Sequence, residues 1–205
     1  MDADLALLDR WCAGDRSSGN ELFKRHFDSV YRFFEHKVGA DVDELVQNTF
    51  LACSHSRDTF RRQCSFRTYL FTIARHQFYG YLRRHHGRAL DAEVTSMADL
   101  NRTTPATRIA RGQDHQRLLT ALRELPLETQ LLLELYYWED MDSNELAEVF
   151  DVTSTTARTR LYRARTALRE RLHQAANEPV SASQSMDDLD AWARAMRARA
   201  HDGEE

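Results

Sequence analysis

The sequence between residues 142 and 171 constrains the fold more than any other part of the chain, because it predicts two short helices joined by a tight turn. Asp142 and Glu145 have the three-residue spacing of a capping box, which marks the start of the first helix. Asp151 falls in the turn, where aspartate adopts left-handed backbone angles more readily than most residues. Thr153 is suited to cap the second helix. Two helices joined in this way can place the second one in the major groove of DNA.

The second predicted helix has an apolar face and a basic face. Small and aliphatic residues recur at helical spacing on the face that we expect to pack inward: Ala157, Leu161, Ala164 and Leu168. Six arginines and one acidic residue lie between Thr153 and Leu172. Arginine can pair with a guanine edge or hold a phosphate, so a DNA-contacting helix is favoured over a basic face exposed only to solvent. The residues predicted to contact DNA are Thr156, Arg158, Thr159, Arg160, Tyr162, Arg163 and Arg165.

A second basic segment runs from residue 61 to residue 88 and contains seven arginines without any aspartate or glutamate. Leu70, Ile73 and Ala74 can form an ordinary core, with Phe66 and Tyr81 as further candidates, and the remaining aromatic residues exceed what a buried stripe requires. Aromatic faces beside arginines can hold unstacked bases of single-stranded nucleic acid. For each single aromatic residue, burial in a core is the better interpretation, whereas for the segment as a whole we favour nucleic-acid binding. The aromatic residues are Phe60, Phe66, Tyr69, Phe71, Phe78, Tyr79 and Tyr81.

The composition favours a helical protein with its own cores. The chain has 205 residues with only seven glycines and three prolines, which favours helices over strands. No apolar run approaches the roughly 20 residues of a membrane span, and the first residues lack a signal-peptide pattern, so we expect a cytoplasmic protein without membrane insertion. The three cysteines are scattered, which argues against a disulfide framework. The net charge of −4 suggests that DNA binding depends on a larger partner, since self-sufficient DNA-binding proteins are usually basic.

The hydrophobic pattern divides the chain into a first helical block at about 4–88 and a second at about 114–175. In the first block, Gly39 ends an amphipathic helix, and Asp41 is predicted to cap the next helix with Glu44 in the capping-box position. We expect the inner face of that next helix to carry Val42, Leu45, Val46, Thr49 and Phe50. Its outer face is polar and acidic, and by default exposed to solvent: Asp43, Glu44, Gln47 and Asn48.

Residues 89–113 lie between the two blocks and have acidic and threonine-rich turn chemistry, so we predict a flexible linker. The tail at 176–205 is rich in serine and alanine after Pro179, and then contains a short amphipathic helix. This tail either hangs free or packs back on the protein and tunes its activity. The apolar side of its helix carries Met186, Leu189, Trp192 and Met196.

Several motifs, in this order, resemble those of bacterial extracytoplasmic-function (ECF) sigma factors: DVDELVQNTFL at 41–51, FRRQCSFRTYLFTIA at 60–74 and ELAEVFDVTSTTARTRLYRARTAL at 145–168. The resemblance covers roughly residues 4–173. It implies an all-α protein with sigma domain two at 4–88, the linker, and sigma domain four with its helix-turn-helix at 114–175. It also implies a subunit that selects promoters for core RNA polymerase, with no catalytic residue, metal or cofactor of its own.

The resemblance further implies which residues meet each partner. The helix at 154–172 would read the minus-thirty-five element of promoter DNA. The segment at 60–84 would melt the minus-ten element and trap a flipped base, with contacts from Arg61, Arg62, Gln63, Cys64, Ser65, Phe66, Tyr69, Arg75, His76, Arg83 and Arg84. The helix at 41–51 would dock on the beta-prime clamp helices, and the beta flap would be a second polymerase contact. The docking residues would be Asp41, Asp43, Glu44, Gln47 and Asn48. Members of the family are commonly held inactive by an anti-sigma protein, although nothing in this chain identifies one.

Two other interpretations compete with a sigma factor. A stand-alone helix-turn-helix regulator would leave the acidic helix at 41–51 and the aromatic-basic segment unexplained. An enzyme or metal protein could use His85, His86 and the cysteines, but no ligand motif organises them. Four positions depart from the family pattern, namely Arg62 and Gln63 where Gly-Asp is common, His76 where Asn is common, and Thr155 where Gly is frequent.

Overall fold

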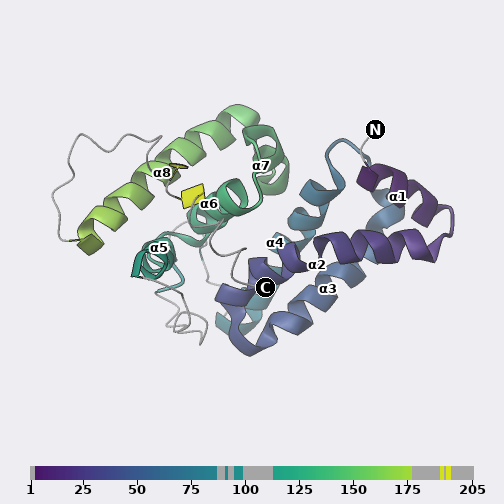
Figure 1. Cartoon of the computed structure of the whole chain (residues 1–205), viewed down its shortest axis with the longest axis horizontal. Helices are drawn as coiled ribbons and strands as arrows, with labels where there is room; N and C mark the ends of the chain where they lie inside the picture. The colour runs from purple at the N-terminus through teal and green to yellow at the C-terminus, as the bar shows by residue number, and fades with distance from the viewer. Residues whose placement is uncertain are drawn as a thin grey trace. The chain divides into compact units, whose positions relative to one another are not determined.

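The computed structural model describes residues 3–86, 91, 95–98, 113–176, 190–191 and 193–194, and every regular element within these ranges is a helix (Figure 1). The all-α prediction is therefore confirmed. Contacts divide the chain into unit 1, which contains residues 1–90 with Ala147–Thr153, and unit 2, which contains Asp91–Leu146 with Ser154–Glu205. None of the helices in the described ranges is both long and apolar enough to cross a membrane.

Unit 1 is built on helices that follow one another along the chain and pack side by side. The long helix α2 contacts α1, α3 and α4, and α3 also packs on α4. Asp15 starts α2, because its Oδ1 accepts a hydrogen bond from Ser17 N at 2.9 Å. Gly39 ends α2 with a φ of 63°, as the sequence predicts. The elements are α1 (Ala3–Cys12), α2 (Arg16–Val38), η1 (Gly39–Asp41), α3 (Val42–Ser56), η2 (Arg57–Thr59) and α4 (Phe66–His86).

The predicted capping role of Asp41 is wrong. Asp41 closes the 3-10 helix η1 at φ −89° and ψ 10°, so it lacks the extended backbone that a capping residue adopts, and its side chain makes no capping hydrogen bond. Its Oδ2 instead accepts a hydrogen bond from the hydroxyl of Tyr81 at 2.6 Å. The inner face of α3 nevertheless matches the prediction, with Val42, Leu45, Val46, Thr49 and Phe50 all buried.

The core of unit 1 is largely aromatic. Phe33 of α2 meets Phe71 and Phe78 of α4 edge to face, with ring centroids 5.7 and 6.4 Å apart. Because α4 packs against both α2 and α3, its buried face is wider than the single stripe that the sequence interpretation allowed. Most aromatic residues of the segment therefore fill this core, as the interpretation favoured for each single residue: Phe66, Phe71, Phe78, Tyr79 and Tyr81 are buried.

Unit 2 packs α8 against both α5 and α6. The leucines of α6 are buried on more than one side, because α5 and α8 both cover this helix. The elements are α5 (Gln113–Arg123), α6 (Leu127–Trp138), α7 (Ser143–Phe150), whose second half groups with unit 1, and α8 (Ser154–Ala176).

Part of the predicted linker belongs to unit 2. Leu127 N donates to Thr95 O at 2.9 Å, and Ala98 N donates to Arg123 O at 3.0 Å. Met97 lies between these two bonds and is fully buried. The segment at 95–98 is therefore packed against the turn between α5 and α6, which a threonine-rich composition could not indicate. The rest of the predicted linker, apart from Asp91 and Gln113, lies outside the described residues.

Gly19 provides a test of how closely α1 and α2 approach. A Cβ atom at this position would lie 2.6 Å from Trp11 Nε1. Trp11 is 6% exposed and meets Phe23 edge to face at 5.1 Å, so the indole has little room to move. We expect Gly19→Ala to lower the free energy of unfolding of unit 1 by about 1–3 kcal/mol, measured by urea unfolding followed through tryptophan fluorescence.

Gly80→Ala in α4 is the matched control. The added Cβ would have Arg84 Nη1 as its nearest neighbour at 3.7 Å, which is an ordinary contact. Because alanine favours a helix over glycine, this variant should be neutral or more stable by up to about 1 kcal/mol. An equal loss of stability in both variants would contradict the close approach at Gly19.

Candidate nucleic-acid interface and docking groove

The start of α7 carries the capping box that the sequence predicts. Asp142 Oδ1 accepts from Asn144 N at 2.7 Å and from Glu145 N at 2.9 Å. The Glu145 carboxylate reaches back to Asp142 N at 3.1 Å. The side chain of Ser154 at the start of α8 donates to Asn144 Oδ1 at 2.5 Å, so the two helix starts are joined directly.

The turn between α7 and α8 also has the predicted geometry. Asp151 adopts a left-handed φ of 53°. The next residue, Val152, donates its backbone N–H to Ala147 O at 3.0 Å, which satisfies a carbonyl at the end of α7. The helix α8 begins at Ser154, directly after Thr153. These observations confirm the predicted helix-turn-helix.

The two faces of α8 follow the sequence prediction. Ala157, Leu161, Ala164 and Leu168 are buried. Tyr162 is 65% exposed, which is unusual for a large aromatic side chain and leaves its ring open to a partner. We call the exposed residues beside it the reading face of α8: Arg158, Thr159, Tyr162 and Arg163.

Two arginines that the sequence assigns to DNA are held by acidic residues. Arg160 Nη1 lies 2.9 Å from Glu128 Oε2 of α6. Arg165 makes two hydrogen bonds to Asp190, from Nε at 3.0 Å and from Nη2 at 2.6 Å. Thr156 is half-buried. The sequence pattern missed both acids because each lies far along the chain from its arginine.

The segment at 60–69 keeps two aromatic residues at its surface. Phe60 and Tyr69 are half-buried, and their rings stack with centroids 4.4 Å apart and an angle of 25° between planes. The Tyr69 hydroxyl lies 2.5 Å from Ser56 Oγ, and burial raises the pKa of this phenol. Phe66 is 0% exposed, so the prediction that it contacts DNA is wrong.

The loop before α4 presents polar side chains. Arg61, Arg62 and Gln63 are exposed, whereas Cys64 and Ser65 are half-buried. Arg62 adopts a φ of 57°, a left-handed conformation that is uncommon for a residue other than glycine, and its guanidinium forms an ion pair with Asp9 of α1. Ser65 starts α4, because its Oγ accepts from Thr68 N at 3.1 Å.

The outward side of α4 adds further basic residues. His76 and Arg83 are exposed and seven residues apart, so they share one side of the helix, with Arg84 exposed beside them. Partial desolvation and then the positive charges of Arg75 and Arg83 lower the pKa of His76, which favours its neutral form. Arg75 is half-buried and lies over the ring of Tyr79 at 5.0 Å.

A groove of about 500 Å³ lies between α2 and α3. Two of the predicted polymerase-binding residues, Asp43 and Gln47, lie at this groove. Phe27 is 45% exposed and Leu51 is 48% exposed. Sequence reasoning missed these two residues, because an exposed apolar residue at helical spacing has the same pattern as a buried one. The lining residues are Phe23, Phe27, Asp43, Val46, Gln47, Phe50, Leu51 and Ser54.

The other predicted docking residues lie beside the groove or inside unit 1. Glu44 is exposed and accepts a hydrogen bond from Asn48 at 3.5 Å on the outer side of α3. Asp41 is half-buried and bound to Tyr81, so it belongs to the internal packing rather than to the groove.

Comparison with known proteins gives two domain matches in the order that the sequence predicts. Residues 22–88 match the model of sigma-70 region 2, and residues 115–168 match the model of sigma-70 region 4. The chain is 27% identical over 174 residues to the ECF RNA polymerase sigma-E factor of Haemophilus influenzae, covering 79% of this chain and 91% of that protein. The chain belongs to the ECF sigma factors. A further ECF relative is BldN of Streptomyces coelicolor, 28% identical over 165 residues, 78% of this chain and 62% of BldN.

Solved structures agree with this assignment. The ECF sigma factor resembles CnrH, in a structure with the cytosolic domain of CnrY, with a TM-score of 0.62 and 25% identity over 84% of this chain and 99% of that one. It also shares the fold of RpoE from Bartonella quintana, in a structure with NepR, with a TM-score of 0.56 and 20% identity over 75% and 95% of the two chains.

The capping box makes a measurable contribution to the interface helix pair. We expect Asp142→Ala to destabilise unit 2 by about 1 kcal/mol, because two backbone N–H groups lose their acceptor. Asp142→Asn keeps an acceptor oxygen and should retain most of this stability. Thermal unfolding followed by circular dichroism compares the two. Equal losses would show that the carboxylate acts through its charge rather than as a cap.

Proposed function

We propose that this ECF sigma factor docks on core RNA polymerase through unit 1 and directs initiation at promoters whose minus-thirty-five element is read by α8. In this proposal residues 4–88 act as sigma domain two, 89–113 as the linker and 114–175 as sigma domain four. The observation that carries the proposal is the reading face, four exposed polar and aromatic residues on a helix-turn-helix whose opposite face is buried.

The reading face has the chemistry that promoter recognition requires. Arg158 can donate two hydrogen bonds to a guanine edge, and Thr159 can contact a base or a phosphate. Tyr162 offers an exposed ring and a hydroxyl, while Arg163 lies one residue further along the helix. Arg160 is held by Glu128 and Thr156 is half-buried, so we assign them to orienting α8 rather than to reading bases.

We assign opening of the minus-ten element to the surface around Phe60 and Tyr69. Their stacked rings are half-buried, so they offer an aromatic edge on which an unstacked base can pack. Arg61 and Gln63 on the adjoining loop are exposed and can meet the backbone or an extruded base. Along α4, the exposed arginines Arg83 and Arg84 supply positive charge for the duplex.

The groove between α2 and α3 is the proposed docking surface for the beta-prime clamp helices. Phe27 and Leu51 provide exposed apolar area, and Asp43, Glu44 and Gln47 provide a polar and acidic border. An apolar strip with a polar rim suits a partner helix that carries apolar residues flanked by basic ones. The beta flap is the proposed polymerase contact of unit 2.

An inhibitory protein partner is a further part of the proposal. The structures of CnrH and of RpoE from Bartonella quintana each contain a second protein, CnrY and the anti-sigma factor NepR respectively. We infer that this chain is also regulated by a protein of the anti-sigma class. We assign it no catalytic step, because its described surfaces suit binding to DNA and to protein.

The docking groove is tested by Leu51→Arg. Leu51 is 48% exposed, so the variant should fold normally, while a charged side chain in the apolar strip should weaken the pull-down of bacterial core RNA polymerase by roughly tenfold or more. The matched control is Tyr162→Arg, which makes the same kind of change at an exposed residue of unit 2 and should leave core binding unchanged. If both variants lose core binding equally, or if neither loses it, the groove is rejected as the docking surface.

The reading face is tested by run-off transcription on a promoter library with core polymerase. Arg158→Ala should weaken initiation from the preferred minus-thirty-five sequence by about 1–3 kcal/mol and relax the preference at one position. A uniform loss on all sequences would demote Arg158 to a phosphate contact. If the free chain bound one promoter tightly and specifically without polymerase, a stand-alone regulator would replace the proposal.

A further inference from the structure

The C-terminal part of the chain returns to unit 2 at Asp190. We call the described part of the tail, residues 190–191 and 193–194, the C-terminal fragment; in Figure 1 it is yellow and lies beside α6 and α8. Both carboxylate oxygens of Asp190 are used: Oδ2 accepts from Arg165 Nη2 at 2.6 Å, and Oδ1 accepts from Arg165 Nε at 3.0 Å. Oδ1 also accepts from the hydroxyl of Tyr137 on α6 at 2.6 Å.

The contact around Asp190 is largely buried, unlike an ion pair on the protein surface. The side chains of Arg165 and Asp190 are 18% and 12% exposed, Tyr137 is fully buried, and so is Ala193 on the same fragment. Burial, followed by the hydrogen bond to Asp190, raises the pKa of Tyr137, so its phenol remains a donor at neutral pH. A partly buried bidentate pair with a further donor is much stronger than an exposed one.

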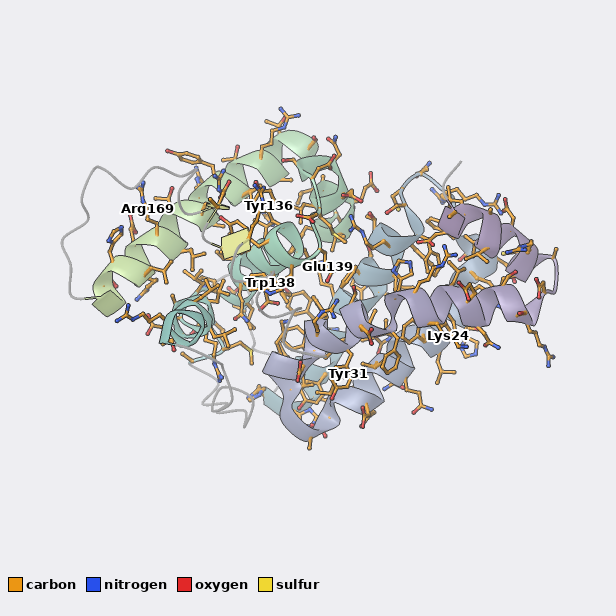
Figure 2. All side chains as sticks on the ribbon, in the orientation of Figure 1. Lys24, Tyr31, Tyr136, Trp138, Glu139 and Arg169 are labelled. Atoms are coloured by element: carbon orange, nitrogen blue, oxygen red, sulfur yellow. The ribbon has the colours of Figure 1, made fainter. Side chains whose placement is uncertain are left out.

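Tyr136 extends the site on its outer side. Its ring, labelled in Figure 2, lies 5.9 Å from the guanidinium of Arg165 and 5.8 Å from that of Arg194. Arg194 Nη2 also donates to the Tyr136 hydroxyl at 3.4 Å. The C-terminal fragment is therefore attached at both Asp190 and Arg194. The predicted apolar anchors of the tail, Met186, Leu189, Trp192 and Met196, lie outside the described residues.

Arg165 lies at the edge of the reading face, on the side of Arg158 and Tyr162. It lies seven residues after Arg158 and three after Tyr162, and at 100° per residue these three side chains emerge within about 60° of one another. A duplex lying along the reading face would therefore bring a phosphate close to Arg165. The guanidinium can donate its paired N–H groups either to the Asp190 carboxylate or to a phosphate. It cannot donate the same N–H groups fully to both anions at once.

We propose that the C-terminal fragment is an intramolecular inhibitor of DNA binding, in which the Asp190 carboxylate occupies the arginine that would otherwise hold a promoter phosphate. The inference rests on the proposed function of α8. It adds that the tail lowers the DNA affinity of the chain and that displacing Asp190 raises it. Because a phosphate contact is independent of base sequence, the effect is the same on every duplex.

The experiment measures binding of the full chain to a fluorescent duplex of random sequence over a series of salt concentrations. Asp190→Asn removes the carboxylate charge that pairs with Arg165. The variant should bind the duplex roughly threefold to tenfold more tightly at low salt, and its affinity should depend on salt more steeply by about one released counterion. Asp188→Asn removes the same charge from the same tail and should change the affinity much less. The double variant Arg165→Ala/Asp190→Asn should lose the gain.

The outcomes separate the inhibitor from the alternatives. If Asp190→Asn lowers the melting temperature while DNA affinity is unchanged, Asp190 is only a structural brace and the inhibitor is rejected. If Asp188→Asn gives the same gain, general charge explains the effect and the inhibitor is again rejected. If neither the natural chain nor Asp190→Asn binds DNA at low salt, or if the natural chain binds without a gain in the variant, the inhibitor alone is rejected. The proposed role of α8 is rejected separately, by run-off transcription with core polymerase in which Arg158→Ala changes nothing.

Discussion

The rotation of α8 about its own axis decides which arginines of this helix can meet DNA. Burial of Ala157, Leu161, Ala164 and Leu168 fixes that rotation, because four apolar residues on one stripe can be removed from water in only one orientation. The bond between Ser154 and Asn144 fixes the start of the helix as well. Side chains on the opposite stripe then require no further ordering of the backbone before they contact a base, which lowers the entropic cost of binding.

The net charge of −4 is compatible with a DNA-binding role for α8, because acidic residues of unit 2 pair with some of the arginines of this helix. Among the residues that the structure describes, three of the six arginines of α8 have acidic partners within unit 2: Arg160 with Glu128, Arg165 with Asp190, and Arg171 with Glu124 at 3.6 Å. Fewer arginines are therefore available to phosphate than the sequence suggests. Weak intrinsic affinity of this kind is suited to a factor that should engage promoters together with a polymerase.

Local sequence signals predicted local structure well. The capping box at Asp142, the left-handed Asp151 and the glycine that ends α2 all involve residues that are close along the chain, and all three are confirmed. The capping role of Asp41 failed because a distant residue, Tyr81, holds its carboxylate. The same limit applies to Phe66, whose burial depends on the packing of α4 against two other helices, and to Arg165, whose partner is 25 residues away. Exposure of Phe27 and Leu51 could not be predicted either, since periodicity places a residue on a face without saying whether that face is covered.

The ion pair between Arg62 and Asp9 connects the loop before α4 to the first helix of the chain. Both side chains are about half exposed, so the pair contributes less than about 1 kcal/mol, enough to bias a strained loop among its conformations without locking it. Substitutions at the amino terminus can thus alter which conformer of the loop is populated. In the proposed role of this loop at the minus-ten element, substitutions in α1 would change how the loop meets the opened DNA strand, while every residue of the loop itself stays the same.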